Sequence, residues 1–393
     1  MLAHSPPLPL LIDYFDEDDD VTTEDEEGIL LALQHRDRVR SIRLQMPVPS
    51  LQKPTMAMSD KFGILECLVI TPPTKEDTSL VLPKTFQAPR LRHLLLMNFA
   101  FPIGSPLLTT AQAVNLFSLC LGDILQSAHF HPNDLLQSLL HTPRLETLFI
   151  DFDSPVPNHS VERQLSHSPV MTHITLPNLR KFVFGGTSAY LEVLLPRMTT
   201  PLLQTLRIEF FDQISFSLPH LLQLLSTIED LRFGHAALTF KERVSVSVYL
   251  HAVARMALLS IEVCCKYLDW QVTSAAQVIN ALKTVFSSVE YLALEYTNNI
   301  SMSPERTNEA DRSQWRELLR LFSNLKVLHI PGALIHALSC SLESEDEDGE
   351  SPMELLPELK ELSYSGSRDS GDEFTRFIVS REDAGHPVVL VYH

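Results

Sequence analysis

The stretch PRLETLFIDF (residues 143–152) ends a leucine-rich run and is typical of a short β-strand entered from a turn. Nearly the same phrase returns as PNLRKFVFGG from Pro177 and as PLLQTLRIEF from Pro201. All three follow the pattern L-x-x-L-x-L, in which Ile, Val, Phe or Tyr can replace leucine. The fourth and sixth positions alternate along a strand and therefore point to one face. Together with the first position, they are the predicted core residues.

The pattern recurs about twelve times between Val39 and Tyr364, at intervals of about 24–36 residues, close to the period of leucine-rich repeats. One such strand cannot bury its apolar side alone, but stacked neighbours build a continuous core. Helix signals separate the strands, for example in residues 131–140 and in residues 273–286, where Ser274 is the expected N-cap. The sequence therefore predicts an α/β fold, an irregular leucine-rich-repeat solenoid (horseshoe) with parallel strands on the concave face and helices on the convex face.

The predicted domain organisation has two parts. Residues 1–38 form an N-terminal capping segment with an acidic loop, and residues 39–393 form the solenoid of about twelve units. Residues 13–28 and 341–352 are strongly acidic, and we expect both to be loops because like charges repel and cannot pack together. Residues 371–393 form the predicted C-terminal cap, which ends in an edge strand.

Composition narrows the class of protein. A hydrophobic content of 45% over 393 residues is enough for a large core, and a net charge of −18 argues against nucleic acid and against anionic membrane surfaces. The five cysteines show no disulfide or zinc spacing, and no run of about 18 apolar residues could span a membrane. These features predict a monomer of the cytoplasm or nucleus, without membrane or nucleic-acid partners.

Motifs for catalysis, cofactors and metals are missing from the sequence. It contains no GxGxxG, GxxxxGK[ST], GxSxG or HExxH motif. His129 and His131 could share a metal ion, but no third ligand is evident nearby, and the alternative interpretation is a pair of solvated loop histidines. We therefore predict a non-enzymatic protein with no cofactor and no metal.

Several segments resemble basidiomycete F-box-like proteins with a leucine-rich region. They are the irregular P-x-L-x-x-L-x-I series, EDEEGILLALQHRDRVRSIRL (residues 24–44), YLDWQV from Tyr267 and LLPELKELSYSG from Leu355. The resemblance covers the chain from about residue 6 onward and implies that the repeat recognises a substrate protein. Family members carry an F-box ahead of this region, which docks on a ubiquitin-ligase adaptor. This sequence lacks an F-box, so we expect adaptor binding only if one lies upstream.

The outward side chains of the strands are the candidate binding residues. In each unit the third, fifth and seventh positions face away from the core, onto the predicted concave surface. Lys181, Arg207 and Arg232 would form a basic spot for an acidic peptide or a phosphate group. Alternatively, Glu209, Asp230 and Glu262 neutralise these cations across the strands. The predicted partner-binding residues are Phe149, Asp151, Lys181, Arg207, Glu209, Arg232 and Tyr291.

Two functions remain open at the level of sequence. The first is a substrate-binding repeat region of an F-box-like ubiquitin-ligase receptor, and the second is a free-standing scaffold or inhibitor that grips a protein partner without any ligase. An enzyme would need clustered acid–base residues, which the sequence does not indicate.

Overall fold

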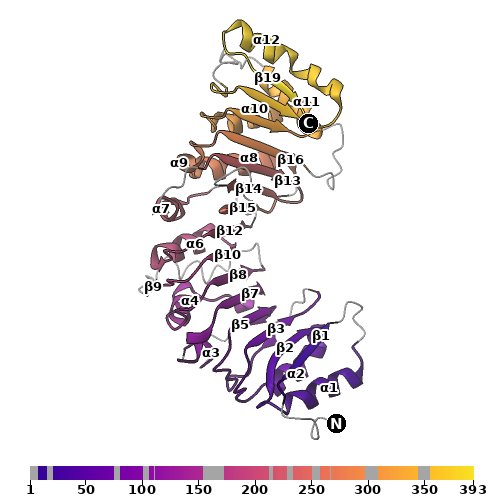
Figure 1. Cartoon of the computed structure of the whole chain (residues 1–393), viewed down its shortest axis with the longest axis vertical. Helices are drawn as coiled ribbons and strands as arrows, with labels where there is room; N and C mark the ends of the chain where they lie inside the picture. Colours follow the sequence, from indigo (N-terminus) through magenta and orange to yellow (C-terminus); the bar gives the residue numbers. More distant parts are fainter. Residues whose placement is uncertain are drawn as a thin grey trace. The chain divides into compact units, whose positions relative to one another are not determined.

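The computed structural model in Figure 1 describes residues 8–15, 21–74, 80–100, 106–109, 111–153, 172–211, 216–227, 233–249, 257–265, 267–296, 309–343 and 355–393. The protein has a mixed α/β fold with a large, mostly parallel sheet and helices. Two compact units, Met1–Leu206 and Arg207–His393, divide the chain, and each is described by itself.

The first unit alternates strands with short helices, in which η denotes a 3₁₀ helix. Its elements are β1 (Leu10–Phe15), α1 (Thr23–Leu33), β2 (Val39–Gln45), α2 (Val48–Ala57), β3 (Cys67–Thr71), β4 (Leu80–Val81), β5 (His93–Met97), β6 (Phe99–Ala100), α3 (Pro106–Thr109), η2 (Ala111–Asn115), β7 (Ser118–Ile124), η3 (Gln126–Ala128), α4 (Pro132–Leu139), β8 (Thr147–Phe152), β9 (Ile174–Thr175), β10 (Lys181–Gly186), α6 (Ser188–Leu194), η4 (Leu195–Arg197) and β11 (Met198–Thr199). Strands β4 with β6 and β9 with β11 form two further two-stranded sheets.

Two buried rows in register hold the first unit's sheet together. The strand order is β1-β2-β3-β5-β7-β8-β10, and every neighbouring pair is parallel. The core positions of the repeat, each no more than 2% exposed, pair directly across these strands. One row is Ile42, Leu68, Leu94, Leu119, Leu148 and Phe182, and the other is Leu44, Ile70, Leu96, Leu121, Ile150 and Phe184.

The helices of this unit cover one face of the sheet. Successive strands are neighbours and run the same way, and right-handed crossovers place every such connection on the same side. Leu135, Leu136 and Leu139 of α4 are buried, whereas Leu140, which caps the C-terminus of this helix, is 50% exposed. Strand side chains on the opposite side of the sheet are half-buried or exposed. In each unit, we call the side of the sheet opposite its fully buried strand side chains the open face.

The second unit begins within β12 and ends at the C-terminus. Its elements are β12 (Thr205–Phe210), α7 (Pro219–Thr227), β13 (His235–Phe240), β14 (Val244–Tyr249), β15 (Leu259–Val263), α8 (Leu268–Ala281), α9 (Lys283–Phe286), β16 (Tyr291–Tyr296), α10 (Glu309–Arg320), β17 (Val327–Ile330), η6 (Gly332–Leu334), α11 (Ile335–Glu343), β18 (Glu361–Tyr364), η7 (Arg368–Phe374), α12 (Thr375–Asp383) and β19 (Val389–Tyr392). Strand β19 pairs in parallel with β18 at the edge, where an edge strand was predicted.

The second unit's sheet departs from the predicted parallel pattern. Its strand order is β12-β15-β14-β13-β16-β17-β18-β19, and β14 runs antiparallel to both of its neighbours. The prediction of parallel strands is therefore wrong here, because residues 240–244 make a tight hairpin instead of a crossover. The repeat expected at Ile228, Leu231 and Phe233 lies mostly outside the described residues.

A buried glutamine fastens this hairpin to the helix that follows. Gln271 is fully buried in α8, and its side-chain amide donates hydrogen bonds to the carbonyls of Lys241 (2.7 Å) and Cys265 (2.8 Å). The first carbonyl belongs to the hairpin turn and the second to the chain leaving β15. One side chain therefore ties the reversed strand pair to the exit of the next strand.

Two sequence-based boundaries are corrected. Helix α8 begins at Leu268 with Tyr267 as N-cap, so Ser274 is a buried residue inside the helix and not its cap. In the acidic run 13–28, residues 13–15 belong to β1 and Thr23–Gly28 to α1, where Thr22 and Asp25 form a capping box, while residues 16–20 lie outside the described residues. Acidic side chains in a first turn complement the helix dipole, which offsets their mutual repulsion. In residues 341–352, positions 341–343 are helical and the rest lies outside the described residues.

The buried rows predict that substitutions at neighbouring positions of one strand lower the free energy of unfolding by unequal amounts. Leu148→Ala should lower the free energy of unfolding by about 2–5 kcal/mol, since it removes a fully buried side chain from the centre of a row. The control Thr147→Ala, on the open face, should cost less than about 0.5 kcal/mol. Urea denaturation followed by circular dichroism measures both, and equal losses for the two variants would contradict this packing.

The glutamine contact predicts a second asymmetry. Gln271→Met should destabilise the protein by about 1–3 kcal/mol, because one buried and one half-buried carbonyl lose their hydrogen-bond donor. Gln277→Met is the matched control, since Gln277 lies on the same helix and its buried amide oxygen accepts no hydrogen bond from the described part of the chain. Thermal unfolding of the two variants is the measurement. An equally large loss of stability in the control would show that helix packing, and not the two hydrogen bonds of Gln271, is responsible.

Candidate functional site

Three predicted binding residues lie on the open face of the first unit. Phe149 and Asp151 project from β8 and are half-buried, and Lys181 projects from the start of β10 and is exposed. In register, Phe149 faces Val183 and Asp151 faces Gly185. The three side chains therefore share one surface, as the alternation predicts.

Phe149 is part of an apolar row that runs across this surface. Direct strand pairing joins five half-buried residues, here called the apolar row: Val69, Leu95, Cys120, Phe149 and Val183. Burial raises the pKa of the Cys120 thiol, so this member stays neutral. Only Phe149 was singled out from the sequence, because the other members look like ordinary strand residues until the register is known.

Gly185 leaves room for the carboxylate of Asp151. A β-carbon added at Gly185 would lie 1.9 Å from Oδ1 of Asp151, closer than any real contact. The glycine therefore lets the acidic side chain lie across the neighbouring strand. Asp151 is held at the surface in this way and takes part in further interactions.

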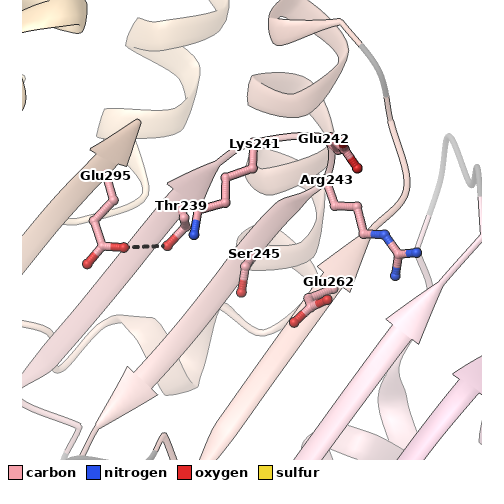
Figure 2. Close-up of a pocket in the computed structure, with 7 residues that line it drawn as sticks. All are labelled: Thr239, Lys241, Glu242, Arg243, Ser245, Glu262 and Glu295. Carbon is pink, nitrogen blue, oxygen red and sulfur yellow. Dashed lines mark hydrogen bonds between the residues drawn. The ribbon is translucent and has the colours of Figure 1, made fainter. Parts of the chain in front are cut away.

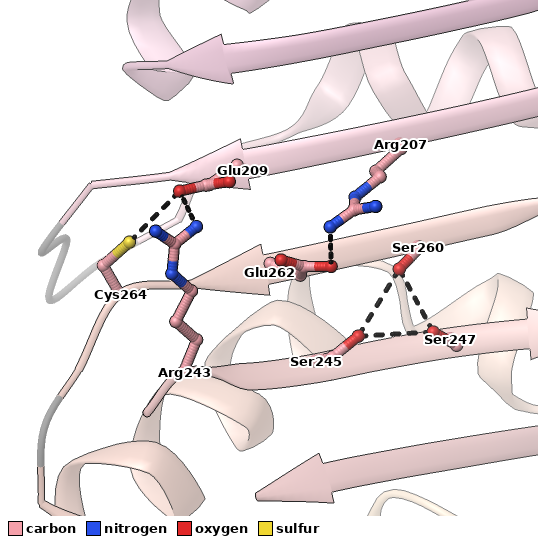
Figure 3. Close-up of polar contacts among 8 residues, drawn as sticks. All are labelled: Arg207, Glu209, Arg243, Ser245, Ser247, Ser260, Glu262 and Cys264. Carbon is pink, nitrogen blue, oxygen red and sulfur yellow. Dashed lines mark hydrogen bonds and ion pairs between the residues drawn. The ribbon is translucent and has the colours of Figure 1, made fainter. Parts of the chain in front are cut away.

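In the second unit, the predicted cations and anions form ion pairs (Figure 3). Arg207 Nη2 lies 2.7 Å from Glu262 Oε1, and Arg243 binds the carboxylate of Glu209. Glu209 also accepts a hydrogen bond from the Cys264 thiol at 3.4 Å. For Arg207, this agrees with neutralisation by Glu262 across the strands, the alternative stated above.

The remaining basic and acidic candidates lie outside the described residues or in the other unit. Arg232 and Asp230 lie outside the described residues, and Lys181 belongs to the first unit whereas Arg207 belongs to the second. Arg243, the partner of Glu209, was not predicted, because it sits in the hairpin turn and not on a repeat position.

A polar hollow of about 480 Å³ lies at the β13–β14 hairpin (Figure 2). Its lining residues are Thr239, Lys241, Glu242, Arg243, Ser245, Glu262 and Glu295. Strand pairing places Glu262, Ser245, Thr239 and Glu295 side by side in a single polar row. The Thr239 hydroxyl donates to Glu295 at 2.9 Å, while the ammonium group of Lys241 makes no ion pair with any described residue.

Beside the polar row lies a row of small side chains. Ser260, Ser247, Ala237 and Ala293 pair directly across four strands, and the hydroxyls of Ser247 and Ser260 lie 3.1 Å apart. We call this the small-residue row. Because these side chains are short, the surface of the sheet is recessed here between the longer side chains of the polar row on one side and an aromatic pair on the other.

Tyr291 belongs to that aromatic pair. Its ring lies 5.2 Å from the ring of His235, which faces it directly in the sheet. Burial, followed by the charge of Glu361, raises the pKa of the Tyr291 hydroxyl, so this group stays protonated and can donate a hydrogen bond. Of the predicted residues, Tyr291 is therefore the one that borders the small-residue row.

His129 and His131 have structural roles and are not solvated loop residues. The ring of His129 packs edge-on against Phe152 at 4.7 Å, and burial lowers its pKa. His131 caps α4, since its Nδ1 accepts a hydrogen bond from the backbone of Asn133 at 3.1 Å. Neither sequence-based interpretation, a metal-binding pair or a solvated pair, included the packing contacts that these two rings make.

Two kinds of feature are absent from the described ranges: a cluster of metal ligands and a membrane-spanning helix. No group of three His, Cys, Asp or Glu side chains there is placed to hold a metal ion. Among the helices of those ranges, none has both the length and the apolar character that crossing a bilayer requires.

Comparisons with known proteins add no family assignment. The sequence matches no protein-family model, and a search of curated proteins finds no match.

The burial of His129 predicts a pH dependence of stability. Because its folded-state pKa is lowered, the unfolded chain binds more protons once the pH falls below about 6.5. The stability that the folded protein gains from keeping His129 neutral is therefore complete above that pH, and it is lost as the pH falls. His129→Gln should flatten the decline in unfolding free energy between about pH 7 and pH 5, without abolishing it, because burial also lowers the pKa of His329.

The control for this titration is His386→Gln, which changes an exposed side chain. Denaturant melts at several pH values compare the slopes of the three proteins. An unchanged slope for His129→Gln would contradict a buried, neutral His129.

Proposed function

We propose that this chain is a non-catalytic protein-recognition module, built as an irregular leucine-rich-repeat solenoid that binds a protein partner on its concave, strand-lined face. The observation that carries the proposal is the small-residue row of the second unit, bordered by Tyr291 on one side and by the polar row on the other. A low strip between taller polar and aromatic side chains suits an extended polypeptide segment, which needs close approach and hydrogen-bond partners.

Lys241 gives the proposed partner its charge. The cations Arg207 and Arg243 are already engaged by Glu262 and Glu209, whereas the Lys241 ammonium is exposed beside the hollow with no described ion-pair partner. An acidic side chain on the partner would complete this pair. The thiol and hydroxyl groups nearby add neutral hydrogen-bonding capacity.

The apolar row of the first unit supports the same function. A half-buried row of five side chains on an open sheet face, with Phe149 the largest, offers contact area of the kind that anchors protein partners. Each unit thus has its own candidate binding surface.

The resemblance to basidiomycete F-box-like proteins extends the proposal to a ligase. In that version the repeat region selects a substrate for a ubiquitin ligase, in the cytoplasm or nucleus, and an adaptor binds only through an F-box upstream. The alternative is a free-standing scaffold or inhibitor. Affinity capture that recovers a partner together with the adaptor supports the receptor, and a stable partner complex without adaptor supports the scaffold.

The proposal predicts face-dependent loss of partner binding. Lys241→Glu should reduce partner recovery by about tenfold, since reversing a charge beside a contact costs more than about 1.4 kcal/mol. Because Lys241 has no ion pair with a described residue to lose, we expect the fold to be unaffected. Lys283→Glu is the control, an equal charge change on exposed residue 283 of α9. Affinity capture from source cells, quantified by mass spectrometry, is the measurement.

A charge swap separates direct contact from support of the fold at Arg207. Arg207→Glu alone breaks the pair with Glu262, and the double variant Arg207→Glu/Glu262→Arg restores it with the charges exchanged. Because Glu262 also lines the hollow, binding that stays lost in the double variant assigns the Arg207–Glu262 pair, and not Arg207 alone, to the contact. If Lys241→Glu, Phe149→Ala and Tyr291→Ala all retain the partner as well as the control does, the open face is not the binding surface.

A further inference from the structure

A cysteine, a histidine and a glutamate lie in line in the second unit, away from the open face. His336 and Cys340 are one turn apart on α11, which brings their side chains to the same side of the helix. Cys340 Sγ lies 4.0 Å from His336 Nε2, and His336 Nδ1 lies 3.2 Å from Glu373 Oε2. Glu373 comes from η7, which packs against α11.

The position of Glu373 fixes the role of each ring nitrogen. An ionised carboxylate only accepts hydrogen bonds, so His336 Nδ1 must carry the proton that it donates to Glu373. In the neutral ring, Nε2 then presents its lone pair to the thiol of Cys340. The Ser339 hydroxyl lies 3.3 Å from Glu373 Oε2 and 2.9 Å from the backbone carbonyl of His336, so its single proton is shared between these two acceptors.

Geometry separates this cluster from a metal site. The cysteine and the glutamate approach different nitrogens of one imidazole, on opposite edges of the ring, so one metal ion cannot bind all three groups. The order thiol, imidazole, carboxylate is instead the order of a nucleophile, its base and the group that orients the base.

The cluster is open to small reagents. The side chain of His336 is 72% exposed and that of Glu373 is 39% exposed, while Cys340 is half-buried on the same surface. Of the other four cysteines, Cys67 is also half-buried but makes no hydrogen bond to a histidine among the described residues, and the remaining three are placed differently. The Cys264 thiol donates to a carboxylate, the Cys265 thiol donates to a backbone carbonyl, and burial keeps Cys120 neutral.

We propose that Cys340 is a thiol-modification site, at which His336 accepts the thiol proton and the thiolate reacts with a low-molecular-weight disulfide. The thiolate sulfur attacks one sulfur of the disulfide, a new S–S bond forms to Cys340, and the original S–S bond breaks. The released thiolate takes up the proton from His336 Nε2 and leaves as a thiol. One disulfide is thus exchanged for another, with no additional oxidant.

The test measures the rate of adduct formation at each cysteine. The full chain is incubated with oxidised glutathione at pH 7, and peptide mass spectrometry follows the mixed disulfide. We expect Cys340 to react about tenfold faster than Cys264, because the attacking species is the thiolate. His336→Gln should slow Cys340 by about fivefold or more, and Glu373→Gln by a smaller factor, since it orients the base and does not touch the thiol.

A second measurement separates proton transfer from access. At about pH 10 an ordinary thiol is ionised without help, so the rates of the wild-type chain and of His336→Gln should converge. Cys340→Ser should lose this adduct altogether, and all three side chains lie at the surface, so circular dichroism should show an intact fold. The proposal is overturned if His336→Gln reacts as fast as wild type at pH 7. It is also overturned if the two rates differ by the same factor at both pH values, or if Cys340 is no faster than Cys264.

Discussion

A parallel strand with one apolar side is stable only when neighbouring strands extend that side into a continuous surface. Register meets this requirement in the first unit, where Leu148 and Ile150 continue rows that pass from strand to strand without a break. Each buried side chain contacts the same position of the next repeat, so burial accumulates along the sheet. The strand spacing, the helix positions and the separate open face all follow from that alignment.

The second unit satisfies the same requirement with a different connection. Here the chain turns back at Lys241–Arg243, so that β14 enters the sheet against the direction of its neighbours, yet Val244, Val246 and Val248 still point into the core. A strand can be reversed in this way because side-chain alternation has a period of two in either direction. The reversal also brings the charged turn to the open face, where it borders the hollow.

The repeat pattern predicted the parts of the fold that depend on alternation. Core positions such as Leu145 and Leu148, the helix at Pro132 and the final edge strand needed only periodicity and cap chemistry. The hairpin at residues 240–244 carries no Gly, Asn or Pro, so no local turn signal marked it. The partner of Glu209 was missed for the same reason, because Arg243 belongs to that turn.

Features that depend on strand register, or on packing between segments far apart in the chain, could not be predicted from the sequence. Val69 and Phe149 are ordinary strand residues until pairing places them in one row, and His129 looks like a loop residue until Phe152 packs against its ring. Likewise, nothing local shows that Glu373 reaches His336, since the two come from different elements. Contacts between separate segments carry the candidate sites, and a single sequence reports such contacts only indirectly.

The division of each strand between a buried row and an open face has a consequence for how such a chain can change over evolutionary time. Thr147 and Phe149 share a strand with Leu148, yet of the three only Leu148 is fully buried. Substitutions at outward positions alter what the surface offers while leaving the stability margin nearly intact. Such a scaffold can diversify its surface residue by residue, without a compensating change in its interior.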